Sequence, residues 1–120
     1  MQSEYLLEKK SGYINFTISG PYNAVKFHCY AKIIAETCGK EKLNRVLVNA
    51  LNVKGTDLSI LERYFIGEKI AELLPAIKIA VVWPEKDINK FAETVALNRG
   101  AFINVIGDVE KAKKWLMSSV

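Results

Sequence analysis

The residues from Arg45 to Val53, RVLVNALNV, form a nearly uninterrupted apolar segment. A run of this length is typical of a strand that is covered on both faces, as in the parallel sheets of α/β proteins. Asn49 lies in the middle of the run, and a buried amide needs hydrogen-bond partners. We expect Asn49 to bond across the sheet rather than to contact a ligand. The segment therefore predicts a central strand.

A helix is predicted directly after this strand. Ser59 and Glu62 fit a capping box, in which each side chain binds an otherwise unpaired backbone amide, although Thr56 or Asp57 could cap one turn earlier. The helix has a wide apolar stripe, which predicts that this helix is the most buried one of the chain. The stripe consists of Ile60, Tyr64, Gly67, Ala71 and Leu74, with Phe65, Ile66 and Ile70 beside them. A glycine in mid-helix, Gly67, indicates close approach to a neighbour.

The other segments alternate between strand and helix patterns. Residues 5–7 and Tyr13–Ser19 predict an antiparallel hairpin at a sheet edge. The remaining expected elements are a helix Ala24–Cys38 capped by Asn23 and ended by Gly39, a strand Ile77–Trp83, a helix capped by Asp87 and closed by Arg99 and Gly100, a strand Phe102–Ile106, and a short helix capped by Asp108. The order ββαβαβαβα predicts a single α/β domain over residues 1–120, with a mixed, mostly parallel sheet.

Composition fits one globular domain, because half of the 120 residues are apolar and a quarter are charged. No apolar run reaches the roughly 18 residues that span a bilayer, and the N-terminus has no apolar signal core. We therefore expect a cytoplasmic protein without a transmembrane segment. The net charge of +4 comes from lysines interleaved with acids, which indicates a solvated surface. No basic stripe with interleaved aromatic residues indicates nucleic-acid binding.

No catalytic, metal or cofactor motif is present, so we expect neither an enzyme nor a bound cofactor. His28 is the only histidine and has no partner nearby in sequence. Cys29 and Cys38 lie nine residues apart in one predicted helix, on different faces, so they cannot pair with each other. We expect both to be buried thiols in a reducing compartment.

Functional sites of open parallel sheets lie beyond the carboxyl ends of the strands. Three segments should meet there, Gly20–Asn23, Asn52–Ser59 and Trp83–Asp87, and Gly107-Asp108 should join them. Asn52–Ser59 combines a glycine, hydroxyls and a helix N-terminus, an arrangement that favours an anion or a phosphoryl group. Capping of the helix alone also accounts for these residues. Neither a phosphate-loop lysine pattern nor a dinucleotide fingerprint occurs.

The element order, the segment Arg45–Leu74 and the ending GDVEKAKKWL resemble the STAS domain, the fold of bacterial anti-sigma-factor antagonists. Small stand-alone SpoIIAA-like proteins are the most similar members, and the resemblance covers about residues 4–116. FAETVALNRGAFINVIGDVEKAKKWL is the most family-like stretch. In the regulatory members, the loop after the central strand carries an aspartate–serine–serine–glycine motif whose serine is phosphorylated by a partner kinase. KGTDLS at this position keeps hydroxyls in Thr56 and Ser59 but lacks the motif.

The resemblance implies a non-enzymatic protein–protein interaction or regulatory module in signalling, whose partner is another protein such as a regulator or a kinase. A homodimer is compatible with it. The expected binding surface is the loop and the exposed side of the next helix, namely Gly55, Thr56, Asp57, Ser59, Glu62, Arg63 and Glu68. Thr56 and Ser59 are the candidate phosphoacceptors. The alternative is a small-ligand binder, for a lipid or a nucleotide, with apolar walls from Tyr22, Tyr64, Phe65 and Trp83.

Overall fold

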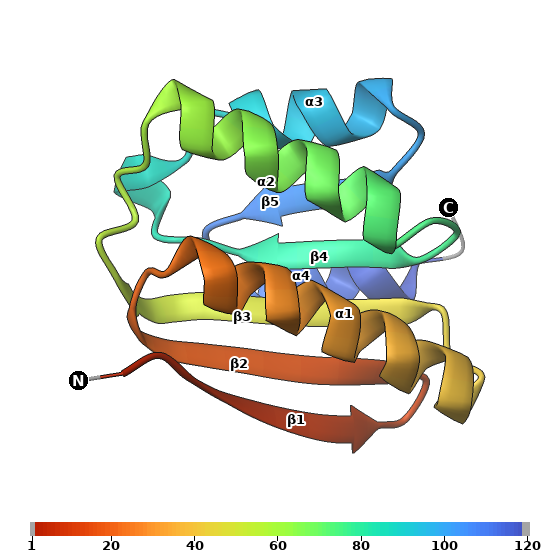
Figure 1. Cartoon of the computed structure of the whole chain (residues 1–120). Helices are drawn as coiled ribbons and strands as arrows, with labels where there is room; N and C mark the ends of the chain where they lie inside the picture. The colour runs from red at the N-terminus through yellow and green to blue at the C-terminus, as the bar shows by residue number, and fades with distance from the viewer. Residues whose placement is uncertain (1, 119–120) are drawn as a thin grey trace.

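The computed structural model describes residues 2–118 as five strands, four α-helices and a 3-10 turn (Figure 1). The elements in chain order are β1 (Glu4–Lys10), β2 (Tyr13–Pro21), α1 (Ala24–Glu41), β3 (Arg45–Lys54), α2 (Ile60–Leu73), β4 (Lys78–Val82), η1 (Glu85–Asp87), α3 (Phe91–Asn98), β5 (Phe102–Ile106) and α4 (Val109–Met117). The predicted order of strands and helices is confirmed.

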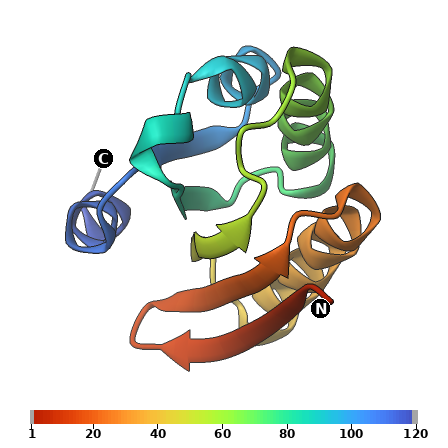
Figure 2. The same ribbon diagram turned by 90° about the vertical axis from the view of Figure 1, so that its left-hand side faces the viewer.

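One five-stranded sheet, in the order β1-β2-β3-β4-β5, organises the molecule. β1 pairs antiparallel with β2 at the edge, and every other pair is parallel, as predicted. The helices α1, α2 and α3 cover one face of this sheet, and α4 lies on the other (Figure 2). α4 packs on β3, β4 and β5, and Tyr13 at the start of β2 packs against the cluster under α4. Within residues 2–118, the rest of this face of β1 and β2 carries no helix.

The core has two parts, one on each face of the sheet. The larger part lies under α1, α2 and α3, where Ile14, Phe16 and Val46 are fully buried. The smaller part lies under α4, where Leu47 of β3 packs with Ala112 and Leu116. Because β3 contributes neighbouring residues to both parts, it is covered on both faces, as its nearly continuous apolar sequence predicted.

Two helix boundaries differ from the sequence prediction. α1 continues through Gly39 to Glu41, and Lys42, at a φ of 57°, takes the left-handed position that Gly39 was expected to hold. An ion pair of 2.8 Å between Glu41 and Lys9 holds this extra turn against β1. Asp87 does not cap α3, because it ends the 3-10 turn and α3 starts four residues later, after Lys90 at a φ of 65°.

The prediction that α2 is the most buried helix is wrong. Its buried residues are Arg63 and Gly67, whereas α1 buries the larger apolar side chains of Tyr30 and Ile34 and the thiol of Cys38. Ile60 is 59% exposed, because only one side of α2 meets the sheet and α3. The close approach predicted at Gly67 is confirmed, since a Cβ at this position would lie 2.5 Å from the carbonyl oxygen of Ala92.

Two polar side chains also differ from expectation. Asn49 does not bond across the sheet, because its amide oxygen accepts a hydrogen bond from the backbone of Leu51 in the same strand. Cys29 is exposed rather than buried, because it lies on the outer side of α1, while Cys38 is buried as expected. Both thiols are free.

Candidate functional site

The predicted meeting of loops at the carboxyl ends of the parallel strands is confirmed by hydrogen bonds between them. The backbone amide of Tyr22 donates to the carbonyl of Lys54 at 2.8 Å, joining the segments that follow β2 and β3. The indole of Trp83 donates to the carbonyl of Thr56 at 3.3 Å, joining the segments that follow β3 and β4. These contacts form one continuous surface at this edge of the sheet.

Thr56 lies inside this surface and is only 5% exposed. Its hydroxyl donates a hydrogen bond of 2.6 Å to the carboxylate of Asp87. Gly55 precedes it at a φ of 77°, a left-handed conformation that lets the loop turn inward at this point. Thr56 therefore has a structural partner, and its hydroxyl faces the protein rather than the solvent.

Ser59 is the exposed hydroxyl of the loop, and the predicted capping box is present. The Ser59 side chain accepts a hydrogen bond from the backbone amide of Glu62 at 3.2 Å, and the Glu62 carboxylate accepts one from the Ser59 amide at 3.1 Å. The Ser59 hydroxyl also lies 3.1 Å from that carboxylate. Helix α2 thus begins at an accessible hydroxyl that already binds an acidic group. Asp57 and Gly55 are exposed beside it.

Arg63 is not part of an exposed surface, which corrects the sequence prediction. Its side chain is buried, and its Nε donates a hydrogen bond of 2.9 Å to the carbonyl of Leu58. This contact ties the first turns of α2 back onto the loop that precedes it. Arg63 is buried because its side chain points from α2 toward the segment around the 3-10 turn η1, where Trp83 and Ile88 line the same small hollow.

Large apolar side chains are exposed on the first turns of α2, next to Ser59. Ile60 and Leu61 are 59% and 63% exposed, and Phe65, one turn further on, is half exposed. Sequence reasoning placed Ile60 and Phe65 in the core. The apolar stripe of α2 was so wide that its periodicity did not show which side of the helix faced the sheet. Ile60 and Leu61 are adjacent in sequence and cannot both face the sheet, and this was the available signal that the first turn exposes an apolar side chain. We call Ser59, Ile60, Leu61, Glu62 and Phe65 the loop–helix surface.

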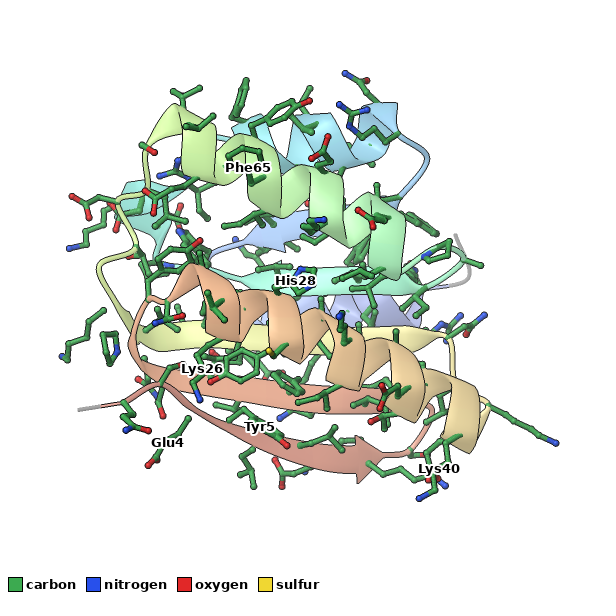
Figure 3. All side chains as sticks on the ribbon, viewed as in Figure 1. Glu4, Tyr5, Lys26, His28, Lys40 and Phe65 are labelled. Carbon is green, nitrogen blue, oxygen red and sulfur yellow. The ribbon has the colours of Figure 1, made fainter. Side chains whose placement is uncertain are left out.

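An apolar cavity of about 150 Å³ lies between α1 and α2, above the sheet. Tyr22, Phe65 and Trp83 line it, as the alternative hypothesis predicted, together with Phe27 and Tyr30. Figure 3 shows His28 on the side of α1 that faces α2, with Phe65 on the facing helix. His28 and Lys69 also line the cavity, and Lys69 pairs with Glu72 at 3.2 Å.

Tyr64 does not line this cavity, in contrast to the prediction. Its hydroxyl instead lies 3.4 Å from Glu68 and accepts a hydrogen bond of 2.8 Å from Arg99, at the contact of α2 with α3. Phe65 belongs both to the lining of the cavity and to the loop–helix surface. Burial raises the pKa of the Tyr22 phenol, and the negative charge of Glu62 raises it further, so the phenol stays protonated at neutral pH.

Comparison with solved structures identifies the fold. An anti-sigma factor antagonist from Mycobacterium paratuberculosis superimposes with a TM-score of 0.62 over 98% of this chain and 96% of its own, at 10% sequence identity. The chain has a STAS, or SpoIIAA-like, fold. An uncharacterized protein from Shewanella loihica with a SpoIIAA-like fold superimposes with a TM-score of 0.53 over 95% of this chain and 93% of its own, at 15% identity.

The similarity to these structures lies in the arrangement of the backbone and not in the sequence. No protein-family model matches the sequence, and no curated protein matches it. Within residues 2–118, no helix is both long and apolar enough to cross a membrane. The STAS fold predicted from the element order is therefore confirmed at the level of structure.

Proposed function

We propose that this protein is a non-enzymatic regulatory module that binds another protein through its loop–helix surface. The observation that supports this proposal most directly is the exposure of Ile60, Leu61 and Phe65 around the accessible cap residue Ser59. Clustered apolar side chains with polar neighbours are typical of protein-binding surfaces. The same fold occurs in an anti-sigma factor antagonist, which supports a regulatory role.

Burial of these side chains against a partner would supply useful binding energy. Complete burial of a Leu, Ile or Phe side chain contributes roughly 1.5–3 kcal/mol. Ile60, Leu61 and Phe65 are already about half covered, so each would contribute about 1 kcal/mol. Together they provide the apolar centre of an interface, and Glu62 and Asp57 beside them form its acidic rim.

Ser59 is the better of the two candidate phosphoacceptors. Its side chain is exposed and bound only within its own capping box, whereas Thr56 would first have to leave Asp87 and turn outward. A phosphate on Ser59 would meet the free amides at the N-terminus of α2, which favours the added charge. It would also repel the Glu62 carboxylate, which now lies 3.1 Å from the hydroxyl. Modification would therefore break the capping box and change the charge of the surface.

The proposed protein partner is tested by affinity capture from the cell of origin, followed by binding measurements with purified partner. Leu61→Ser and Phe65→Ser should each weaken binding about fivefold or more, because each removes roughly 1 kcal/mol of apolar burial. Leu97→Ser is a matched control, since Leu97 is an exposed apolar residue on α3. An equal loss of affinity in all three variants, or no loss of affinity in Leu61→Ser and Phe65→Ser, would show that the partner does not bind the loop–helix surface.

The kinase switch is tested separately by incubation with candidate kinases and intact-mass measurement. We expect one added phosphate in the wild type and in Thr56→Ser, and none in Ser59→Ala. Ser59→Glu should change partner affinity, while Ser59→Asn, which keeps the cap without a charge, should not. A protein that takes up no phosphate, and whose partner binding is the same in Ser59→Glu, has no switch at this loop.

The apolar cavity supports a second candidate function, the binding of a small ligand. Its lining is almost entirely aliphatic and aromatic, which favours a lipid or another apolar molecule over a nucleotide. Apolar cavities of about this volume accept molecules of the size of benzene. A ligand that binds only the folded chain must raise its melting temperature. Thermal melts with fatty acids and nucleotides test this, and Ala31→Leu, which fills the cavity, should abolish any rise.

A further inference from the structure

β1 has an outer edge with no pairing partner among the described residues. It pairs with β2 in one unbroken register, from Glu4 opposite Ser19 to Lys10 opposite Tyr13, without a bulge. β1 contains neither proline nor glycine, so all of its outward amides and carbonyls can pair. A regular free edge of this kind is a template for an additional strand.

The opposite edge of the sheet, at β5, is protected. The backbone amide of Val105 donates to the Glu93 carboxylate at 2.6 Å, and the carbonyl of Val105 accepts a hydrogen bond from Lys90. Both partners come from α3 and the residue before it, and they occupy the backbone amide and carbonyl of Val105 in the middle of the β5 edge. Side chains thus occupy backbone groups in the middle of the β5 edge, whereas no described strand pairs with the outer edge of β1.

The two faces of β1 have different surroundings. Tyr5 stacks on Phe16 with a ring distance of 4.9 Å, and Lys9 pairs with Glu41, so the odd-numbered residues face α1. Glu4, Leu6, Glu8 and Lys10 point to the other face, where no helix of the described residues covers β1. Leu6 is 58% exposed there.

The sequence of β1 is complementary to itself in one antiparallel register. When two identical strands pair antiparallel about a two-fold axis, facing residues must point to the same side of the sheet. Centred on Leu7, the strand pairs over its whole length and places Glu4 opposite Lys10 at both ends. Leu6 then faces Glu8, and Tyr5 faces Lys9.

The neighbouring registers in which facing residues still point to the same side of the sheet are unfavourable. A register centred on Leu6 places Glu4 opposite Glu8 twice and leaves the lysines at the end of the strand unpaired. A register centred on Glu8 places this carboxylate opposite its own copy. Like charges directly opposite each other destabilise a strand pair, and opposite charges stabilise it. Only the register centred on Leu7 combines full overlap with two favourable charge pairs.

We propose that β1 pairs antiparallel with β1 of a second copy of this chain, centred on Leu7, so that two five-stranded sheets join into one continuous sheet. Charge complementarity between Glu4 and Lys10 favours β1 of a second copy as the pairing strand over an unrelated strand. An interface made mainly by one strand pair buries little surface, so the dimer is weak and depends on concentration. The loop–helix surface lies on other elements and stays free in the dimer.

Charge reversal tests the proposal, because Glu4 and Lys10 lie at opposite ends of the strand and cannot reach each other within one chain. Sedimentation velocity over a concentration series should show a monomer–dimer equilibrium for the wild type. Glu4→Lys and Lys10→Glu should each raise the dissociation constant at least about tenfold, since two favourable pairs become repulsive. The double variant should return to the wild-type value, and an equimolar mixture of the two single variants should dimerise.

Glu36→Lys and Lys111→Glu, on exposed positions of α1 and α4, are controls with the same changes in net charge and should leave the dissociation constant unchanged. Circular dichroism, and melting temperature at concentrations at which the wild type is monomeric, should be the same in all variants, because the substituted side chains are exposed. A wild type that stays monomeric at every concentration overturns the proposal. So does a dimer that tolerates both reversals, or one that neither the double variant nor the mixture restores.

Discussion

The Thr56 hydroxyl and the Asp87 carboxylate are joined by a hydrogen bond of 2.6 Å, although the residues are 31 positions apart in the chain. One belongs to the loop that leaves β3, and the other ends the 3-10 turn that follows β4. The Trp83 indole binds the carbonyl of Thr56, so this residue is held through both its side chain and its main chain. The loop that presents Ser59 is therefore fixed by buried contacts.

We predict that Thr56→Val lowers the free energy of unfolding by about 1–3 kcal/mol, because it removes a partly buried hydrogen bond to a carboxylate at nearly constant volume. Urea denaturation followed by tryptophan fluorescence measures this loss. Thr56→Ser is the control, since it keeps the hydroxyl and should retain most of the stability. A Thr56→Val variant as stable as the wild type would show that the contact with Asp87 contributes nothing to the fold.

We predict that Ser59→Ala lowers the free energy of unfolding by about 1 kcal/mol, because it removes the side-chain cap of α2. Ser59→Asn should keep nearly the wild-type stability, since asparagine is an equally good cap residue. Both values come from the same urea denaturation experiment. If alanine and asparagine at position 59 gave equal stability, the hydrogen bond between Ser59 and the Glu62 amide would have no net effect.

The strands and most helix caps could be predicted because their signals are local. Asn23, Ser59 and Asp108 cap helices as expected, since a cap hydrogen bond joins residues two or three positions apart. β3 was evident from its continuous apolar sequence, because a strand between two layers needs apolar residues on both faces. The order of the elements then led to a mostly parallel sheet with an antiparallel edge strand through the rules for crossover connections, whereas the order of the strands came from the structure.

The positions of Arg63, Asp87 and Ile60 could not be predicted, because they depend on which neighbours the fold brings close. α2 is apolar on several sides, so periodicity alone did not reveal that Ile60 faces solvent and Arg63 faces the interior. Asp87 resembled a helix cap in sequence, but Thr56 reaches it from the neighbouring loop. The loop was therefore placed correctly at the carboxyl ends of the parallel strands, while the surroundings of its side chains came from tertiary contacts.

The two cysteines should differ strongly in reactivity. We predict that a thiol reagent such as 5,5′-dithiobis(2-nitrobenzoate) modifies Cys29 rapidly and Cys38 only when the chain unfolds, because Cys29 is exposed and Cys38 is buried. Burial also raises the pKa of the Cys38 thiol, which lowers its thiolate fraction at neutral pH. Cys29→Ser should abolish the fast reaction and leave the slow one. Rapid labelling of Cys29→Ser would contradict this assignment.

Lys78 anchors α4 to the sheet, although it is a buried lysine without a carboxylate partner among the described residues. Its Nζ donates to the carbonyl of Trp115 at 2.7 Å and to the carbonyl and hydroxyl of Ser118 at 3.1 Å, and it lies 4.6 Å from the centre of the Trp115 ring. We predict that Lys78→Met lowers the free energy of unfolding by about 1–3 kcal/mol at neutral pH, because carbonyls at the end of α4 lose their donor.

The contribution of Lys78 should also depend on pH with a defined sign. Burial, and to a lesser degree the nearby charge of Arg45, lower the pKa of Lys78 below its ordinary value of 10.5. Between the lowered pKa and 10.5, the unfolded chain binds more protons at this position than the folded chain, so stability rises with pH across that range. Lys78→Met lacks this titration. The wild type should therefore gain stability over Lys78→Met as pH increases from neutral toward 10.5. Urea denaturation of both proteins at several alkaline pH values measures the difference between their free energies of unfolding. If this difference stayed constant or shrank as pH rose, the three hydrogen bonds and the aromatic ring would compensate fully for the burial of the charge.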